Sequence, residues 1–94
     1  MNSPFEEIAF EDLQHIFDEV TEERCKQRKK WGLQFHGLDA WVCILLEEVG
    51  EVAKGVNDPK RASKPVLWSI RQELLQVAAV ATAMIQQIDT GEPT

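Results

Sequence analysis

Hydrophobic residues recur every three or four positions over three stretches of the chain, and this spacing predicts three amphipathic helices. The first covers about residues 10–29, the second about 38–54 and the third about 65–89. Alternation of apolar and polar residues is short, and no Asn-Gly or Asp-Gly pair joins two candidate strands. The sequence therefore predicts an all-α fold, a small helical bundle of about three main helices.

Residues that start or end helices stand between these stretches. Gly32 and Gly37 interrupt the pattern after the first helix, and Asp39 or the turn before it is expected to cap the second. Gly55 is expected to end the second helix. Pro65 suits the first turn of the third, because its missing N–H has no partner there in any case.

The second and third helices are joined by a short loop, which predicts an antiparallel helix hairpin. The third helix carries a broad apolar arc, as expected for burial from more than one side. Trp41 and Met84 are interpreted as core residues. Trp68 lies on the polar side of the third helix, which suggests contact with a second subunit. A chain this short builds a modest core, so we expect oligomerisation to complete it.

Length and charge narrow the choice of partners. The 94 residues argue for one domain, 1–94, with tails at about 1–8 and 90–94. The net charge of −6 disfavours a nucleic acid or an anionic membrane as partner. The sequence shows no signal peptide and no membrane span. Cys25 and Cys43 form no CxxC motif and are expected to be reduced thiols of a cytoplasmic protein.

Glutamates crowd the margin of the second helix's apolar face, in the stretch LLEEVGEV at residues 45–52. On a helical wheel Glu48 lies at the edge of that face, and Glu47 and Glu51 lie next to it on the same side. An ordinary solvated helix places its acids opposite the apolar stripe. This arrangement indicates that the margin faces something other than water.

A fourth acid, Glu73, falls inside the apolar arc of the third helix, where an unpaired carboxylate costs free energy. It must be protonated, bound to a metal ion or paired with an arginine. Gln76, one helical turn further on, lies at the polar border of the arc. The arginines considered for a pair with Glu73 are Arg24, Arg28 and Arg71.

A helix hairpin brings the acids together, because Glu51 and Glu73 are about equally distant from the loop. Each like-charge pair one turn apart on a helix costs about 0.2–0.5 kcal/mol, and a bound cation relieves that repulsion. Oxygen ligands without Cys or His favour a hard ion, Mg²⁺ with Mn²⁺ as the alternative. Hard ions on carboxylates are typical of phosphate chemistry, although the chain has no Walker loop and no GxGxxG.

The pattern Glu47-Glu48-x-x-Glu51, then 21 residues, then Glu73-x-x-Gln76, resembles the EExxE…ExxD signature of MazG-like nucleotide pyrophosphohydrolases. These belong to the all-α NTP pyrophosphatase superfamily. The resemblance extends over about residues 10–88, and KWGLQFHGLDAW is similar to the linker before the acidic helix in small members. Gln76 departs from the signature, which usually has Asp there.

The resemblance implies Mg²⁺-dependent hydrolysis of a nucleoside triphosphate to the monophosphate and pyrophosphate, by a homodimer or homotetramer. Glu48 and Glu51 are the expected catalytic residues. Because Gln76 adds no charge, a second ion would be held more weakly. The implied metal ligands are Glu47, Glu48, Glu51, Glu73 and Gln76.

Cations and aromatic residues near the acidic positions are candidate substrate contacts. Lys54, Arg61, Arg28 and Lys30 could meet phosphate oxygens, although each could equally be a solvated charge. The base is expected against Trp31, Gln34 or His36. The alternatives are a helix-end core aromatic for Trp31 and an ordinary loop histidine for His36.

Two other functions remain open on the sequence. One is a weakly active or inactive relative that binds a nucleotide or a metal ion without turnover, as Gln76 would suggest. The other is a helical interaction module in which Glu73 forms a salt bridge and the remaining acids are solvated.

Overall fold

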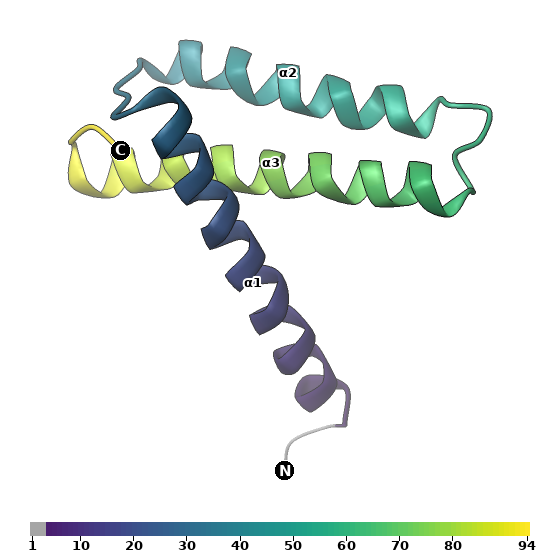
Figure 1. Cartoon of the computed structure of the whole chain (residues 1–94). Coiled ribbons are helices and arrows are strands. Elements are labelled where there is room, and N and C mark those ends of the chain that lie inside the picture. The colour runs from purple at the N-terminus through teal and green to yellow at the C-terminus, as the bar shows by residue number, and fades with distance from the viewer. Residues whose placement is uncertain (1–3) are drawn as a thin grey trace.

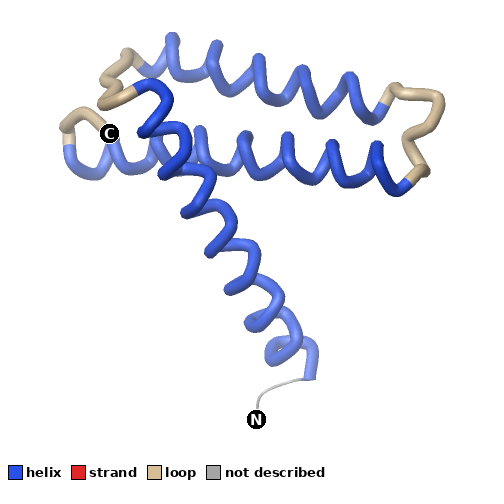
Figure 2. Tube along the Cα trace, viewed as in Figure 1, coloured by secondary structure: helices blue, strands red, loops and turns tan. Residues whose placement is uncertain are grey.

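Three helices make up the computed structural model, which describes residues 4–94, with side chains from Phe10 onward. They are α1 (Pro4–Trp31), α2 (Leu38–Val56) and α3 (Lys64–Thr90). Loops alone connect these helices, and no strand occurs in the described part of the chain (Figure 2). α2 and α3 lie antiparallel, while α1 crosses α3 and its N-terminal half projects away from the hairpin (Figure 1). The predictions of an all-α fold and a helix hairpin are confirmed.

The start of α1 differs from the prediction, whereas the starts of α2 and α3 agree with it. The predicted tail at 1–8 is helical from Pro4, and residues 1–3 lie outside the described part of the chain. Gly37 is the N-cap of α2, so the turn before Asp39 is the correct alternative, and Asp39 stands in the first turn. α3 begins at Lys64 with the proline in its first turn, as predicted.

Gly55 does not end α2, which continues to Val56 with Asn57 as its C-cap. A Cβ at Gly55 would lie 2.7 Å from Cγ1 of Ile70 on α3. The glycine is therefore needed for the close approach of α2 to α3 and not for a left-handed cap.

The C-terminal residues were predicted to be a loose tail, and this is wrong. Gly91 ends α3 with φ of 68°, and Thr94 then returns to the linker between α1 and α2. The Gln34 N–H donates to the Thr94 carbonyl at 3.0 Å, and the Thr94 N–H donates back at 2.9 Å. The linker has no helix to satisfy its backbone groups, so the returning segment supplies the partners.

The buried core is small and centres on Trp41, which is 2% exposed and packs against Val80 and Ala83. Its Nε1–H donates to Oε1 of buried Gln87 at 2.7 Å, so the indole is buried with its polar group satisfied. Met84 packs against the edge of this cluster. Both residues thus belong to the core, as predicted.

The single chain covers its apolar surface incompletely. Its radius of gyration is 15.5 Å, against about 12 Å for a compact domain of this length. Large side chains on the projecting half of α1 stay exposed, Phe10 at 69% and Phe17 at 56%. Trp68 is 60% exposed, with the Arg71 guanidinium 5.7 Å from its ring centre. None of the helices over residues 4–94 combines the length and the apolar character that a membrane span needs.

Candidate functional site

The acidic margin of α2 faces α3 and the C-terminal half of α1. Glu48 is half-buried, and its Oε2 is buried without a hydrogen-bond partner among the described residues. Burial raises the pKa of the Glu48 carboxyl, and the negative charges of Glu73, Glu51, Glu47 and Glu23 raise it further. The acids that the sequence singled out therefore repel one another across the hairpin.

These carboxylates do not form a ready-made cage. Among residues whose side chains are described, no group of three or more His, Cys, Asp or Glu could hold a metal ion as positioned. The donor set nevertheless suits a hard cation, because carboxylate oxygens are its preferred ligands. The orphaned Oε2 of Glu48 is the strongest sign of such a fit, since buried polar atoms normally have a partner.

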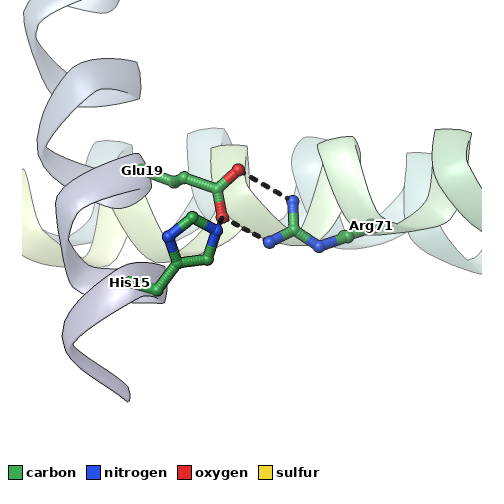
Figure 3. A network of polar contacts seen from close by, with 3 residues as sticks. All are labelled: His15, Glu19 and Arg71. Carbon is green, nitrogen blue, oxygen red and sulfur yellow. Dashed lines mark hydrogen bonds and ion pairs between the residues drawn. The ribbon is translucent and has the colours of Figure 1, made fainter. Parts of the chain in front are cut away.

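Glu73 is only partly buried, because α1 and α2 cover just part of the arc on α3. Arg24, Arg28 and Arg71 were considered as ion-pair partners of Glu73. None of them forms an ion pair with it among the described side chains, so that prediction is wrong. The Arg71 guanidinium instead donates to both carboxylate oxygens of Glu19 on α1, with Nη1 3.1 Å from Oε1 (Figure 3). Arg24 Nε donates to Gln86 Oε1 at 3.2 Å. Glu73 thus has no ion-pair partner among the described side chains.

One pocket joins predicted metal ligands to predicted base contacts. It has a volume of about 250 Å³ and lies where the C-terminal end of α1 meets α2 and α3. Trp31 and Gln34 share it with Glu47 and Glu48. Trp31 is 48% exposed, so it is a pocket wall and not a helix-end core aromatic. The full lining is Gln27, Trp31, Gln34, Trp41, Ile44, Glu47, Glu48, Val80 and Ala83.

His36 is not among the residues lining that pocket. Its ring meets the Trp41 ring edge-on, with centroids 4.8 Å apart. Its backbone N–H donates to Gln87 Oε1 at 3.1 Å, and Gln87 Nε2 donates to its carbonyl at 2.6 Å. The histidine therefore supports the core, and the prediction that it faces the base finds no support in the structure.

The predicted cationic contacts are spread over the molecule. Lys30 Nζ lies 5.0 Å from the Trp31 ring centre, close to the pocket. Lys54 is exposed in the last turn of α2, and Arg61 is exposed in the loop at the far end of the hairpin from Trp31 (Figure 1). Arg28 lines a different pocket, between α1 and α3. Only Lys30 thus lies beside the aromatic wall.

Gln76 is half-buried on α3, one helical turn beyond Glu73. Its side-chain amide makes no hydrogen bond among the described residues, so its side-chain carbonyl oxygen is free to act as a neutral metal ligand. Its place in the proposed ligand set therefore stays a prediction.

Sequence reasoning missed Glu23, whose charge adds to the raised pKa of Glu48. It stands one helical turn before Gln27, which is 6% exposed and lines the pocket. The i to i+4 relation to Gln27 was the available signal that an acid borders the same face.

Comparison with known proteins finds no family model, no curated protein and no solved structure that matches the chain. The chemistry of the pocket is therefore argued from its residues.

Proposed function

We propose that the protein is a Mg²⁺-dependent nucleoside triphosphate pyrophosphohydrolase, which converts (d)NTP to (d)NMP and pyrophosphate. The observation that carries this proposal is the pocket shared by Trp31 and Glu48. The lining combines the aromatic side chain of Trp31 with Glu48, whose Oε2 is buried without a hydrogen-bond partner among the described residues. An aromatic surface beside uncompensated acids suits a ligand that brings both a planar ring and metal-bound phosphates.

The ion would be held by carboxylates from both helices of the hairpin. Gln76 would add a neutral oxygen, and a cation would relieve the repulsion among the acids around Glu48. When bound, Mg²⁺ or Mn²⁺ supplies Lewis-acid chemistry to phosphate oxygens. The proposed ligands are Glu47, Glu48, Glu51, Glu73 and Gln76.

Glu48 is the proposed general base. Its raised pKa brings the carboxylate closer to the working pH, where proton transfer from a water molecule is more effective. The water oxygen forms a bond to the α-phosphorus, the bond from that phosphorus to the α–β bridging oxygen breaks, and pyrophosphate leaves. Glu51, one turn along α2, would help to orient the water. Lys30 stands close enough to the aromatic wall to meet a phosphate of the bound nucleotide.

The size of the pocket supports a shared site. Its volume of about 250 Å³ is below the roughly 300–1,000 Å³ of typical small-molecule sites. One chain would therefore enclose only part of a nucleotide. The exposed apolar half of α1 offers a surface for a second copy, and a homodimer or homotetramer would cover it.

The proposal is tested by measuring pyrophosphate release from a panel of dNTPs and NTPs with Mg²⁺ present. Glu51→Gln and Glu73→Gln should each lower release by about 100-fold or more, the scale of losing a group that stabilises transition-state charge. Glu22→Gln, an equal charge change at an exposed position of α1 outside the pocket lining, should leave it unchanged. Full release in both site variants, with helical circular dichroism intact, would refute the proposal.

The alternative is a binding or interaction module without turnover. The observation that favours it is that no three acids converge within the described residues. A rise in melting temperature with millimolar Mg²⁺, but no pyrophosphate from any nucleotide, would support metal or nucleotide binding alone. No rise with Mg²⁺ or Mn²⁺ would exclude both metal-dependent functions and leave the interaction module.

A further inference from the structure

A second pocket lies between α1 and α3. It shares no lining residue with the pocket that contains Trp31 and Glu48. Its volume is about 240 Å³, whereas a single water needs only roughly 10–15 Å³ of such space. It is therefore large enough for a polyatomic ion with a small attached group. Its lining is Val20, Thr21, Arg24, Cys25, Arg28, Thr82 and Gln86.

Two arginines give this pocket its charge. Arg24 and Arg28 stand one turn apart on α1. Burial lowers the pKa of the Arg24 guanidinium, and the positive charge of Arg28 lowers it further. Neither has a carboxylate within ion-pair distance among the described side chains. In a chain with net charge −6, two neighbouring arginines without a counter-ion are an unusual arrangement, because acids are abundant enough to pair with them.

The hydrogen bonds at the pocket leave donors available. Gln86 Oε1 accepts from Arg24 Nε at 3.2 Å, which fixes the guanidinium and leaves both of its Nη groups free. The Nε2 group of Gln86 has no hydrogen-bond partner among the described residues. The hydroxyls of Thr21 and Thr82 donate to Phe17 O and Ala78 O in their own helices. The donors that remain for a ligand are therefore those of the arginines and of Gln86.

We propose that this pocket binds a phosphate group, as inorganic phosphate or a small phosphate monoester. The free Nη fork of Arg24 matches two phosphate oxygens, and Arg28 supplies the second positive charge. Val20 and Cys25 form an apolar wall beside them, which would accommodate an apolar group on the ester. The site contains no acid and so needs no divalent metal.

Isothermal titration of the full chain in EDTA tests this, with inorganic phosphate and phenyl phosphate as separate probes. Both should bind, and tighter binding of phenyl phosphate would identify an ester as the better ligand. Arg24→Gln and Arg28→Gln should each weaken binding by at least about tenfold, because each removes a charge-assisted hydrogen bond. Absence of binding by both probes, or unchanged affinity in the arginine variants, would overturn the proposal.

A matched control is the variant Lys26→Gln/Lys29→Gln, which removes two exposed charges of α1 outside the pocket. Its affinity should stay within about twofold of the parent, because exposed charges contribute little. Gln86→Glu keeps an acceptor for Arg24 but adds a negative charge, so a folded variant should lose phosphate. Glu48→Gln should bind phosphate normally, which separates this site from the proposed catalytic one.

Discussion

The Arg71 guanidinium on α3 donates to both carboxylate oxygens of Glu19 on α1. His15 Nε2 lies 3.8 Å from the same carboxylate, and the Trp68 ring lies on another side of the guanidinium. This pair joins the projecting helix to the hairpin. It also engages the arginine nearest in sequence to Glu73, so this arginine forms its ion pair with Glu19 and not with Glu73.

The Glu19–Arg71 pair should give α1 a pH-dependent attachment. The pair lowers the pKa of Glu19 below its ordinary 4.5, so its stabilisation is complete above that pH and is lost as pH falls through the lower folded-state pKa. The difference in melting temperature between the parent and Glu19→Gln should be present at pH 8 and should vanish in stronger acid, where the carboxyl is protonated in both states. It should also shrink in 1 M NaCl, since the pair is partly exposed. A difference that persists in acid would contradict this origin.

Glu48→Gln should stabilise the protein without metal while removing its response to metal. The substitution ends the repulsion with Glu51, worth about 0.2–0.5 kcal/mol, and the melting temperature in EDTA at pH 7.5 should rise by roughly 1–4 °C. Because burial and neighbouring acids raise the pKa of Glu48, the gap between variant and parent should close as pH falls through the folded pKa towards 4.5. Differential scanning fluorimetry with and without Mg²⁺ measures both effects. An equal Mg²⁺ response in both proteins would remove Glu48 from the ligand set.

The two glycines of α2 should respond oppositely to alanine. A Cβ at Gly50 meets nothing within 4 Å, so Gly50→Ala should add about 0.5–1 kcal/mol to the free energy of unfolding. At Gly55 the new Cβ would meet Ile70 Cγ1 at 2.7 Å, and overpacking costs about 1–3 kcal/mol. Urea unfolding should therefore show a net loss for Gly55→Ala. Equal stabilisation by both would show that α2 and α3 approach less closely.

Gln87→Met should destabilise the core through hydrogen bonding alone, because the two side chains have similar shape. The buried Trp41 Nε1–H loses its acceptor, at a cost of about 1–3 kcal/mol. The backbone of His36 loses its two bonds as well. Urea unfolding monitored by tryptophan fluorescence measures the loss. Gln14→Met, at an exposed position of α1, should stay within about 0.5 kcal/mol of the parent.

Phe17→Asp should reduce self-association, if the exposed half of α1 meets a second copy as proposed. Phe17 is 56% exposed on that face, and a charge there would be costly to bury. Sedimentation equilibrium should show a larger monomer fraction for Phe17→Asp than for the parent. Lys29→Gln, which changes the net charge by the same amount, should associate like the parent. A monomeric parent protein would exclude the proposed oligomer.

The sequence predicts the elements better than the contacts between them. Helical periodicity is a local property, so the three helices and the hairpin of α2 and α3 could be found from it. The purpose of Gly55 depends on Ile70, which lies across the hairpin, and only packing could show it. The return of Thr94 to Gln34 likewise depends on unpaired backbone groups that carry no sequence signal.

The residues in and around the pocket that contains Trp31 and Glu48 also differ in how far the sequence could place them. The wheel positions of Glu48 and Glu51 on α2 were sufficient to place them on one margin. Glu23 was missed because the crossing of α1 over α3 decides which face of α1 meets the acids. The role of His36 stays a prediction for a related reason, since its proximity to Trp31 along the chain does not determine which side of the linker it faces.

The backbone pairing of Thr94 with Gln34 has a practical consequence for anyone preparing this protein. Gln34 lines the pocket that contains Trp31 and Glu48, so a residue joined after Thr94 would begin beside that pocket. α1 begins at Pro4, and its N-terminal half projects away from the hairpin (Figure 1). An affinity tag at the amino end therefore leaves the entrance open, whereas the same tag at the carboxyl end would obstruct it.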